Sequence, residues 1–476
     1  MLDLAGSATL NSSKSSKELL IFTESPLRSA LHHINSIPQK KEVSMKSTKW
    51  LAIAAGVAVS TVALAGCTSA ASSTGVPQSA KAKITIWVDD ARSKPAQAYA
   101  TAHPELHATV QSVDNSAGNI PSKIALATKA GKSVPDLVFL SQPDEISSLL
   151  ANPVNFPLAL DSVVKKSVLD GYASGTISRC TFGGKAYCLP NDLAQTVLYY
   201  NKPLFTKFGY KVPATFDDWL ALGKKLAVDH PGYSLGSVNG RYGLDAYFGS
   251  SQCDFNTSTE PTKVKIDVTS KNCTRVTDVI GPLVANGTLS TLDPFDAAFT
   301  PIVKGGKLLA TISPSWMGEY GIKPNYTPEG DWAVAPMPTW AGASKNYSGA
   351  VGGGIWVVSA KSKNQSAALK FAEALTTDVS IQSAASTYPA DKASATAWLA
   401  AAASDKWYAS DPSGVYTEAA GKVSTTLGYV RYEPQLNDLY NSTILKNASG
   451  DIGAALTDFG TQVTSAAKSA GYTVSK

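Results

Sequence analysis

The hydrophobic pattern between residues 83 and 140 predicts strands that alternate with helices. Short apolar runs rich in β-branched residues predict strands at 83–88, 108–113 and 135–140. Between them, 94–103 and 120–129 have the spacing of helices. Such a β-α-β-α-β order is typical of a mostly parallel sheet with helices on both faces.

Apolar runs and helix-end residues predict a strand and two helices after residue 195. A β-branched and aromatic run at 196–200 predicts a strand buried on both faces. Pro203 suits the first turn of a short helix, and Gly209 suits its end. Thr215 lies three residues before Asp218, which predicts a capping box at the start of a longer helix.

The order of residues in this part of the chain resembles the extracellular solute-binding proteins of family 1, the carbohydrate-binding subunits of bacterial ABC importers. The resemblance rests on Cys188-Leu-Pro190, Tyr199-Tyr-Asn-Lys202, Phe205, Gly209 and Pro213-Ala-Thr-Phe-Asp-Asp-Trp219. The chain departs from the family at Phe216 and Asp217, where Trp and then Asp or Glu are usual. Further similar segments lie at 131–136, 305–316, 331–338 and 352–359, so that the resemblance covers about residues 81–470.

The resemblance implies an α/β, two-lobe periplasmic-binding-protein-like fold of type II. Each lobe would hold a mostly parallel sheet flanked by helices, with hinge crossings between the lobes. The expected boundaries are 83–192 and 338–388 for lobe 1, and 196–335 and 389–476 for lobe 2. A chain of 476 residues has the length for two such lobes. We expect 241–250 to be a loop against the cleft.

The N-terminal part of the sequence is typical of an export signal. Residues 1–44 are polar and predict a non-structural upstream extension, with the working start at Met45. Residues 45–66 combine two lysines with an apolar run and predict a signal peptide. The end of that run, Leu64-Ala-Gly-Cys67, resembles a lipobox, so Cys67 would carry a lipid and 67–82 would be a tether. The alternative is an ordinary cleavage site that happens to precede a cysteine.

The other four cysteines predict two disulfides, as is common in exported proteins. Three connectivities are possible. A hairpin that turns at Gly183-Gly184 with a three-residue loop would place Cys180 opposite Cys188. This favours Cys180–Cys188, with Cys253–Cys273 as the second pair. A zinc site is the rival reading, but the C-x-x-C spacing is missing.

Charge and motifs argue against several function classes. The net charge is +5, and it falls to 35 − 33 = +2 once the 7 basic and 4 acidic residues of 1–66 are set aside, which gives no basis for a nucleic-acid surface. The sequence has no G-x-S-x-G, H-E-x-x-H or P-loop motif. His103 and His107 have helical metal spacing, but Pro104 lies between them. We therefore expect no catalytic residue, no cofactor and no metal.

Polar side chains at strand ends are the first candidates for ligand binding, because ligands of open α/β sheets bind beyond the carboxyl ends of strands. Asp89 and Asp90 end the first strand, Gln142 follows the third, and Asp192 precedes a crossing. A carboxylate can accept hydrogen bonds from two neighbouring sugar hydroxyls. The alternatives are a helix N-cap for the first pair, a solvated loop for Gln142 and a turn for Asp192.

Aromatic side chains near strand ends are the second candidates, because a sugar packs its C–H face on an aromatic ring. Trp316 follows Ser315, and Trp356 follows three glycines that would let the backbone approach a ligand. Tyr247 and Tyr388 are weaker candidates. For each of the four, a place in the hydrophobic core is the alternative.

These observations predict a lipid-anchored receptor on the extracytoplasmic side of the cell membrane. It would capture a sugar or oligosaccharide between two closing lobes and deliver it, as a monomer, to the transmembrane subunits of an ABC permease with a separate ATPase. One alternative is a secreted carbohydrate-active enzyme in which Asp89 and Asp192 form a carboxylate pair. Another is a binding protein for a non-sugar solute such as iron, a peptide or a polyamine.

Overall fold

The computed structural model describes residues 78–476 except 117, 261, 344 and 425–429. The predicted extension, the signal peptide, the lipid-bearing Cys67 and most of the tether lie outside the described residues. Among the helices that are described, none has both the length and the apolar character needed to span a bilayer.

The first lobe is built on a five-stranded sheet in the order β2-β1-β3-β12-β6. The strands are β1 (Ile84–Val88), β2 (Ala108–Ser112), β3 (Leu137–Leu140), β6 (Leu189–Pro190) and β12 (Ile355–Val358), with a small hairpin of β4 (Thr181–Phe182) and β5 (Lys185–Ala186). The helices are α1 (Asp90–Ala102), η1 (Pro104–Leu106), α2 (Asn119–Lys129), η2 (Pro143–Glu145), α3 (Ile146–Leu150), α4 (Lys166–Gly171), α5 (Ser174–Ile177), η3 (Ser178–Cys180), α11 (Gln365–Thr377) and α12 (Val379–Gln382).

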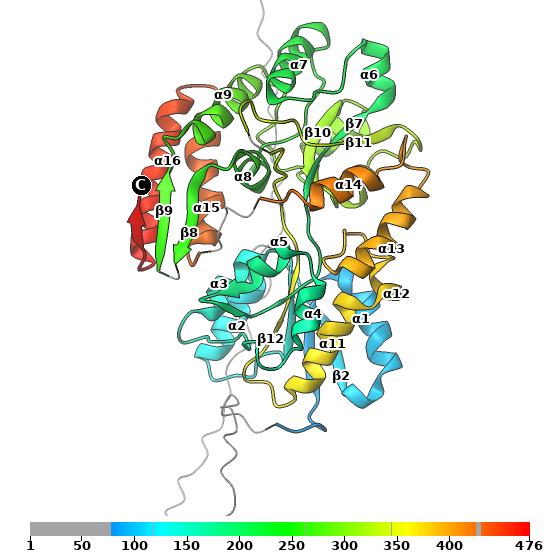
Figure 1. The fold of residues 1–476 in the computed structure, drawn as a ribbon, viewed down its shortest axis with the longest axis vertical. Helices are drawn as coiled ribbons and strands as arrows, with labels where there is room; N and C mark the ends of the chain where they lie inside the picture. Colours follow the sequence, from blue (N-terminus) through cyan, green and yellow to red (C-terminus); the bar gives the residue numbers. More distant parts are fainter. Residues whose placement is uncertain (1–77, 117, 261, 344, 425–429) are drawn as a thin grey trace, which may run out of the picture. The chain divides into compact units, whose positions relative to one another are not determined.

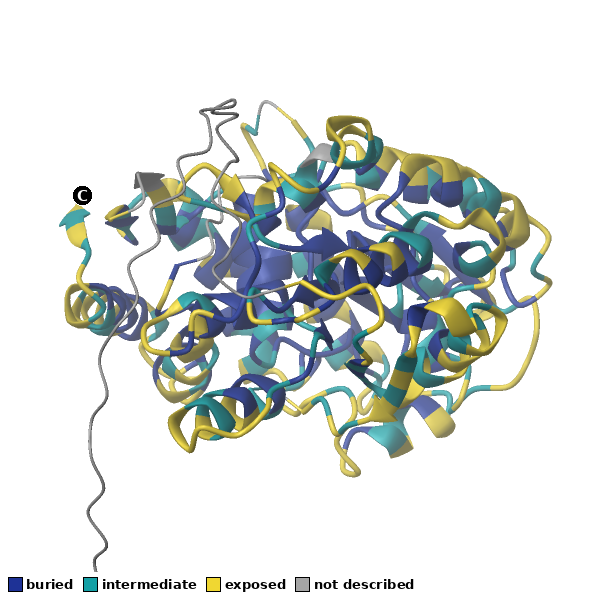
Figure 2. Ribbon diagram, turned by 90° about the horizontal axis from the view of Figure 1, so that it is seen from below, coloured by how far each residue is buried: buried dark blue, intermediate teal, exposed yellow. Residues whose placement is uncertain are grey.

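Both faces of this sheet are covered, as the strand and helix pattern predicts. β1 pairs in parallel with β2 and β3, whereas β12 runs antiparallel to β3 and β6. Along β3, Leu137 and Phe139 join one apolar cluster while Val138 and Leu140 join another. Figure 1 shows α2 and α3 on one side of the strands and α1 and α11 on the other. The strand core is correspondingly buried, and exposed residues lie on the outer sides of the helices (Figure 2).

The second lobe contains two three-stranded sheets, β10-β7-β11 and β13-β9-β8. The strands are β7 (Thr196–Asn201), β8 (Asp254–Glu260), β9 (Lys263–Asp267), β10 (Ala310–Pro314), β11 (Trp332–Ala335) and β13 (Thr473–Ser475). The helices are α6 (Lys202–Phe208), α7 (Phe216–Asp229), η4 (Tyr242–Phe248), α8 (Gly249–Ser251), α9 (Lys271–Ala285), α10 (Thr300–Lys304), η5 (Gly318–Ile322), α13 (Lys392–Ala403), α14 (Ser413–Ala420), α15 (Glu433–Tyr440), η6 (Asn441–Leu445) and α16 (Ile452–Ser469).

Strand direction in the second lobe differs from the expectation of a mostly parallel sheet in each lobe. β7 runs antiparallel to both β10 and β11. Parallel pairing around this sheet occurs as isolated bridges, Ser234 with Leu308 and Ser237 with Ser290. An apolar strand pattern reports burial but not direction, so the sequence could not separate the two arrangements.

The segment 241–250, expected to be a loop, is helical instead. It forms the π-helix η4, followed by the single turn α8, and every residue of both is buried. Gly243 allows this packing, because a Cβ atom there would lie 2.0 Å from the Tyr440 hydroxyl. A mixture of glycine and aromatic residues resembles a loop in sequence, and π-helices are too rare to be expected.

The predictions around α6 and α7 are confirmed. Gly209 ends α6 in the left-handed conformation, with φ at 68°. At the start of α7, the Thr215 hydroxyl accepts a hydrogen bond from the Asp218 amide at 3.0 Å, and the Asp218 carboxylate accepts one from the Thr215 amide at 3.0 Å. Asp218 therefore completes the capping box despite its shorter side chain.

Both favoured disulfides are present. Cys180 pairs with Cys188, and Cys253 pairs with Cys273 at the start of α9. The β4–β5 hairpin turns through Gly183 and Gly184 alone, because Phe182 pairs with Lys185. The loop thus has two residues rather than the expected three.

Three chain segments cross between the lobes side by side. The Leu193 amide donates to the Tyr388 carbonyl oxygen at 3.1 Å, and the Val351 amide donates to the Ala194 carbonyl oxygen at 3.1 Å. The expected boundary at 338 falls inside a segment that packs on α7, where Trp340 stacks on Phe216 with ring centroids 3.6 Å apart. The passage to the first lobe occurs later, at the glycines that precede β12.

Candidate functional site

A cavity of about 230 Å³ lies where the crossing segments meet both lobes. The first lobe contributes residues of α1 and of the loop after β3, and the second lobe contributes residues that follow β10. The lining residues are Arg92, Ser141, Gln142, Asp192, Trp316, Tyr320, Gly352, Gly353, Gly354 and Thr387. A site at strand ends between two lobes is the usual place for a ligand in this class of fold.

The charged side of the cavity is made by Arg92 and two aspartates. Arg92 forms an ion pair with Asp89 at 3.0 Å and lies 3.8 Å from the nearer Asp192 oxygen. Its guanidinium also lies over the Phe139 ring, 4.4 Å from the centroid. Burial acts to lower the pKa of Arg92, but the neighbouring carboxylates outweigh it and raise that pKa. Arg92 is therefore a fixed cation at the cavity wall.

Asp192 is held rigidly at the crossing. Its Oδ1 accepts hydrogen bonds from the Gly354 amide at 2.9 Å and from the Asn191 side chain at 3.0 Å. Burial raises the pKa of Asp192, while Arg92 acts in the opposite direction. The carboxylate thus joins two crossing segments and faces the cavity at the same time.

The aromatic side of the cavity comes from Trp316 and Tyr320. The Trp316 indole N–H donates to the Val351 carbonyl oxygen at 2.9 Å. The rings of Tyr242 and Tyr320 lie edge-on to Trp316 at 6.4 and 6.2 Å. The polar edge of the indole is thus already paired, and the indole lines the cavity as an apolar group.

The glycines before β12 let the backbone pass close to these side chains. Gly352 and Gly353 have φ of 87° and 102°, a region that other residues rarely adopt. A Cβ atom on Gly354 would lie 2.4 Å from the Phe139 ring. The Arg179 guanidinium donates to the Gly352 carbonyl oxygen at 3.0 Å and supports the turn.

Three of the predicted site residues, Gln142, Asp192 and Trp316, line this one cavity. Asp89 does not line the cavity. It forms an ion pair with Arg92, which does, and it caps α1 by accepting a hydrogen bond from the Arg92 amide at 2.9 Å. The N-cap alternative therefore describes Asp89 correctly. Asp90 lies on the exposed side and pairs with the Ser112 hydroxyl.

The other predicted aromatic residues are placed in the interior. Trp356 is 1% exposed, and its indole N–H donates to the Asn191 side chain at 3.1 Å. Tyr247 is 1% exposed within η4. Tyr388 packs on Trp398 with centroids 5.4 Å apart, although its neighbour Thr387 reaches the cavity. The structure does not bring these three rings to the cavity lining.

Sequence reasoning missed Arg92, Tyr320, Ser141 and Thr387. Arg92 could have been predicted from the sequence. It follows the N-cap aspartate Asp89 by three residues, so both side chains lie at the same helix end. Tyr320 lies in η5 and follows Trp316, which precedes that helix, by four residues, and the two rings lie 6.2 Å apart. Ser141 and Thr387 had no local signal that distinguished them from other loop residues.

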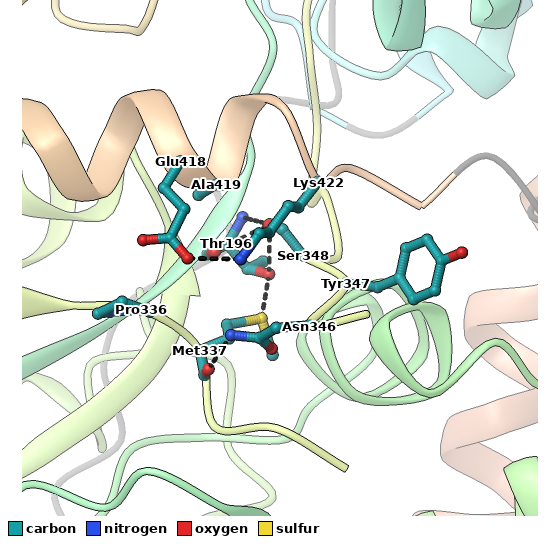
Figure 3. Close-up of a pocket in the computed structure, with 9 residues that line it drawn as sticks. All are labelled: Thr196, Pro336, Met337, Asn346, Tyr347, Ser348, Glu418, Ala419 and Lys422. Carbon is teal, nitrogen blue, oxygen red and sulfur yellow. Dashed lines mark hydrogen bonds and ion pairs between the residues drawn. The ribbon is translucent and has the colours of Figure 1, made fainter. Parts of the chain in front are cut away.

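Other hollows in the described residues suit a ligand less well. Figure 3 shows the residues around a small pocket beside Thr196, where the Thr196 hydroxyl donates a hydrogen bond to the Met337 sulfur. The volume of this pocket is about 10 Å³, about the size of a water molecule. A wider hollow of about 430 Å³ lies in the second lobe, near Tyr233 and Thr291, and is lined by residues of that lobe alone. No cluster of three metal-ligating side chains occurs among the residues that the structure describes.

Two solved structures with similar folds are binding proteins of ABC transporters in complex with sugars. The galacto-N-biose/lacto-N-biose I-binding protein of Bifidobacterium longum superimposes with a TM-score of 0.71, at 21% identity, over 84% of this chain and 100% of that one. A binding protein of B. animalis subsp. lactis, in complex with β-1,6-galactobiose, has a TM-score of 0.70, at 20% identity, over 83% and 99%. At these identities the likeness establishes the two-lobe type II fold.

Two curated relatives share sequence with parts of the chain. An α-glucosides-binding periplasmic protein of Rhizobium meliloti is 32% identical over 123 residues, which is 24% of this chain. A galactooligosaccharide-binding protein of Bacillus subtilis is 27% identical over 184 residues, which is 38% of this chain. The matched segments span 26% and 42% of the lengths of these relatives.

The sequence profile of bacterial extracellular solute-binding proteins matches residues 88–381, more than half of the chain. The matched range contains β2, β3, β6 and β12 of the first sheet, the last residue of β1, and nine of the ten cavity-lining residues, with Thr387 just beyond it. Together with the fold, this match shows that the chain belongs to the bacterial extracellular solute-binding protein family.

Proposed function

We propose that this protein captures a sugar or short oligosaccharide in the cavity lined by Arg92, Asp192 and Trp316, and delivers it to an ABC permease. The observation that carries the proposal is that an indole side chain and a fixed arginine–carboxylate pair line one cavity at the lobe crossing. The relatives and structural neighbours are named for binding galactosides, glucosides or related disaccharides, which supports a sugar as the ligand.

The two sides of the cavity suit the two sides of a pyranose ring. The apolar C–H face of a sugar would pack on Trp316, which removes apolar surface from water. The hydroxyls would accept from Arg92 and Gln142 and donate to Asp192, and hydrogen bonds to charged groups are the stronger kind. Because the lining residues come from both lobes, a ligand would favour the closed arrangement by differential affinity.

The wider role is part of the same proposal. Cys67 would carry the lipid that anchors the protein to the outer side of the cell membrane, with 67–82 as a tether. The described end of this tether is bound to the first lobe, where the Asn364 side chain donates to the Ala80 carbonyl oxygen at 3.1 Å. The closed, ligand-bound monomer would dock on the transmembrane subunits of an importer whose ATPase is a separate chain. Metabolic labelling with a fatty-acid analogue tests the anchor, because Cys67→Ala would abolish the label if the proposal holds.

Isothermal titration of the purified protein with a panel of mono-, di- and trisaccharides tests the binding role. We expect Trp316→Ala to weaken the best sugar about tenfold or more, since a buried aromatic contact contributes about 1.5–3 kcal/mol. Val228→Ala, at a side chain that is 80% exposed, is the control and should leave the affinity unchanged. Absence of binding to every sugar by the unaltered protein would refute the proposal.

The enzyme alternative is less well supported by the geometry. Asp89 and Asp192 both contact Arg92, so neither is a free carboxylate poised on the opposite side of a substrate bond. The family is one of binding proteins. Release of reducing ends from oligosaccharides by the purified protein, lost in Asp192→Asn, would nevertheless favour the enzyme.

A further inference from the structure

Residues 78–82, at the end of the expected tether, are bound to one place on the first lobe. They run beside the turn between β12 and α11. The Asn364 side chain donates to the carbonyl oxygens of Ala80 and Ala82, at 3.1 and 3.0 Å. Asn364 is 4% exposed, so these hydrogen bonds are shielded from water. The path of the chain from Cys67 is therefore fixed to the first lobe and not to the second.

Six lysines lie at the same edge of the first lobe as this attachment. They occur in three short segments without an acidic residue, Lys81-Ala-Lys83, Lys129-Ala-Gly-Lys132 and Lys361-Ser-Lys363, and all six side chains are exposed. The segments precede β1, join α2 to β3 and follow β12. Because β1 and β3 are parallel and β12 is antiparallel to β3, these three points share one edge of the sheet. We call the six lysines the basic edge.

Acidic side chains of the adjoining segments are fewer and have partners of their own. The Asp136 carboxylate accepts from the Thr85 amide at 2.8 Å, and the Asp161 carboxylate accepts from the Ala186 amide at 3.0 Å. Glu105 is paired with a lysine outside the basic edge, at 3.4 Å. Within the described ranges, none of the six lysines forms an ion pair with an acidic side chain. The edge therefore presents positive charge to its surroundings.

The basic edge and the cavity lie at opposite ends of the first sheet. β1 and β3 run from the basic edge to the cavity, which is lined by Ser141 and Gln142 directly after β3. In Figure 1 the blue start of the described chain lies at the end of the first lobe that is remote from the crossings. From Cys67 to Gln78 the chain has 78 − 67 = 11 residues, which reach about 40 Å at most. A lipid on Cys67 would thus keep the basic edge close to the bilayer.

We propose that the basic edge of the first lobe rests on the anionic lipid headgroups of the cell membrane, with the cavity turned outward to the incoming ligand. The proposal rests on the proposed anchor for its setting in the cell, whereas the attraction itself depends on the lysines. Each lysine near an anionic bilayer adds to the attraction, and a basic patch strengthens the hold of an acyl anchor. Salt screens this attraction, so the lobe can also leave the surface.

Flotation with lipid vesicles tests the proposal on the whole chain. Cys67→Ala removes the site of the lipid, and the vesicles contain either phosphatidylcholine alone or phosphatidylcholine with about one-third phosphatidylglycerol. We expect stronger binding to the vesicles with phosphatidylglycerol at low salt, and loss of this difference at high salt. The apolar run before Cys67 is common to all variants, so differences between variants report on the lysines.

Variants at the lysines beside the attachment locate the contact. The combined substitutions Lys81→Gln, Lys83→Gln, Lys361→Gln and Lys363→Gln should weaken binding to the phosphatidylglycerol vesicles by at least about tenfold. Arginine at the same four positions keeps the charge and should retain the binding. The matched control changes four exposed lysines of the second lobe and should leave the binding unchanged: Lys202→Gln, Lys207→Gln, Lys211→Gln and Lys224→Gln.

Three results would overturn the inference. They are unaltered vesicle binding by the four-lysine variant, equal binding to both kinds of vesicle at low salt, and tighter binding to soluble polyphosphate than to vesicles, which would assign the edge to an anionic polymer. Sugar titration provides the separate control, because none of these substitutions touches the cavity. If the protein binds no sugar but floats in a lysine-dependent way, the proposed function fails and this inference stands.

Discussion

Arg92 illustrates how a single side chain organises this site. It is held by Asp89 from its own helix end and lies 3.8 Å from Asp192 of the crossing segment, with the Phe139 ring beneath it. A buried cation needs such partners, since its transfer from water is costly without them. The same contacts fix the position of its remaining donors, which a ligand can use without further ordering.

Glu145 provides a pH-dependent stability prediction at the residue scale. It is 4% exposed, its Oε1 accepts from the Gly118 amide at 2.7 Å, and its Oε2 lacks a hydrogen-bond partner among the described residues. Burial raises its pKa to about 8, although the Gly118 amide opposes the shift. The folded state therefore holds this proton over a pH range in which the unfolded chain has released it.

The pKa of Glu145 is higher in the folded protein than in the unfolded chain. Its contribution to the free energy of unfolding is therefore fully present below the ordinary pKa of about 4.5 and is lost as the pH rises through about 8. We expect the free energy of unfolding to fall with rising pH in this window, by up to about 1.4 kcal/mol per pH unit for this group. Glu145→Gln should reduce that slope, as measured by urea unfolding at pH 6, 7, 8 and 9, while Glu433, whose pKa is also raised to about 8, keeps its own part of it. An unaltered slope would show that Glu145 does not titrate there.

At the scale of elements, helix ends control local stability. α7 begins with a complete capping box, whereas the N-terminus of α9 has no side-chain cap. Trp219 and Leu226 of α7 are fully buried in the second-lobe core. The cap therefore supports a helix on which much of that core is assembled.

Thr215→Ala should lower the free energy of unfolding by about 1 kcal/mol, because the Asp218 amide would lose its acceptor. Thr461→Ala, in the exposed middle of α16, is a matched control, since it removes only a bond to the carbonyl oxygen four residues earlier. We expect that control to change stability by less than about 0.5 kcal/mol in the same chemical denaturation experiment. Equal effects of the two substitutions would contradict the role given to the cap.

At the scale of the whole molecule, a buried ion cluster joins the two lobes. Arg241, at the start of η4, contacts Asp144 of η2 at 2.7 Å and Glu433 of α15 at 3.2 Å. The Asn256 side chain donates to the second Glu433 oxygen at 2.7 Å. Burial raises the pKa of Glu433 to about 8 even though Arg241 opposes this. The arginine thus compensates acidic groups from both lobes in this arrangement.

Arg241→Met should destabilise the protein by about 3–5 kcal/mol, because the Asp144 carboxylate would remain buried without its cation and Glu433 would lose a hydrogen-bond donor. Lys166→Met breaks the exposed pair with Asp170 and serves as the control, with an expected cost below about 1 kcal/mol. Thermal and urea unfolding measure both. Similar small effects from the two substitutions would show that the cluster does not hold the lobes together.

Local sequence was sufficient for much of the architecture. The strands β1, β2 and β3, the α6 and α7 boundaries and both disulfide pairs followed from apolar periodicity, capping residues and cysteine spacing, because these signals act over a few residues. The strand-end rule also selected Gln142, Asp192 and Trp316, which share one cavity. The resemblance to known proteins supplied the two-lobe arrangement, which periodicity alone does not contain.

Contacts between distant parts of the chain decided the rest. The antiparallel pairing of β7, the burial of η4 and the interior position of Trp356 depend on neighbours more than a hundred residues away. The pairing of Arg92 with Asp192 likewise exists only once the crossings bring those segments together. A sequence pattern reports how buried a residue must be, whereas its partners are selected by the packing of the whole chain.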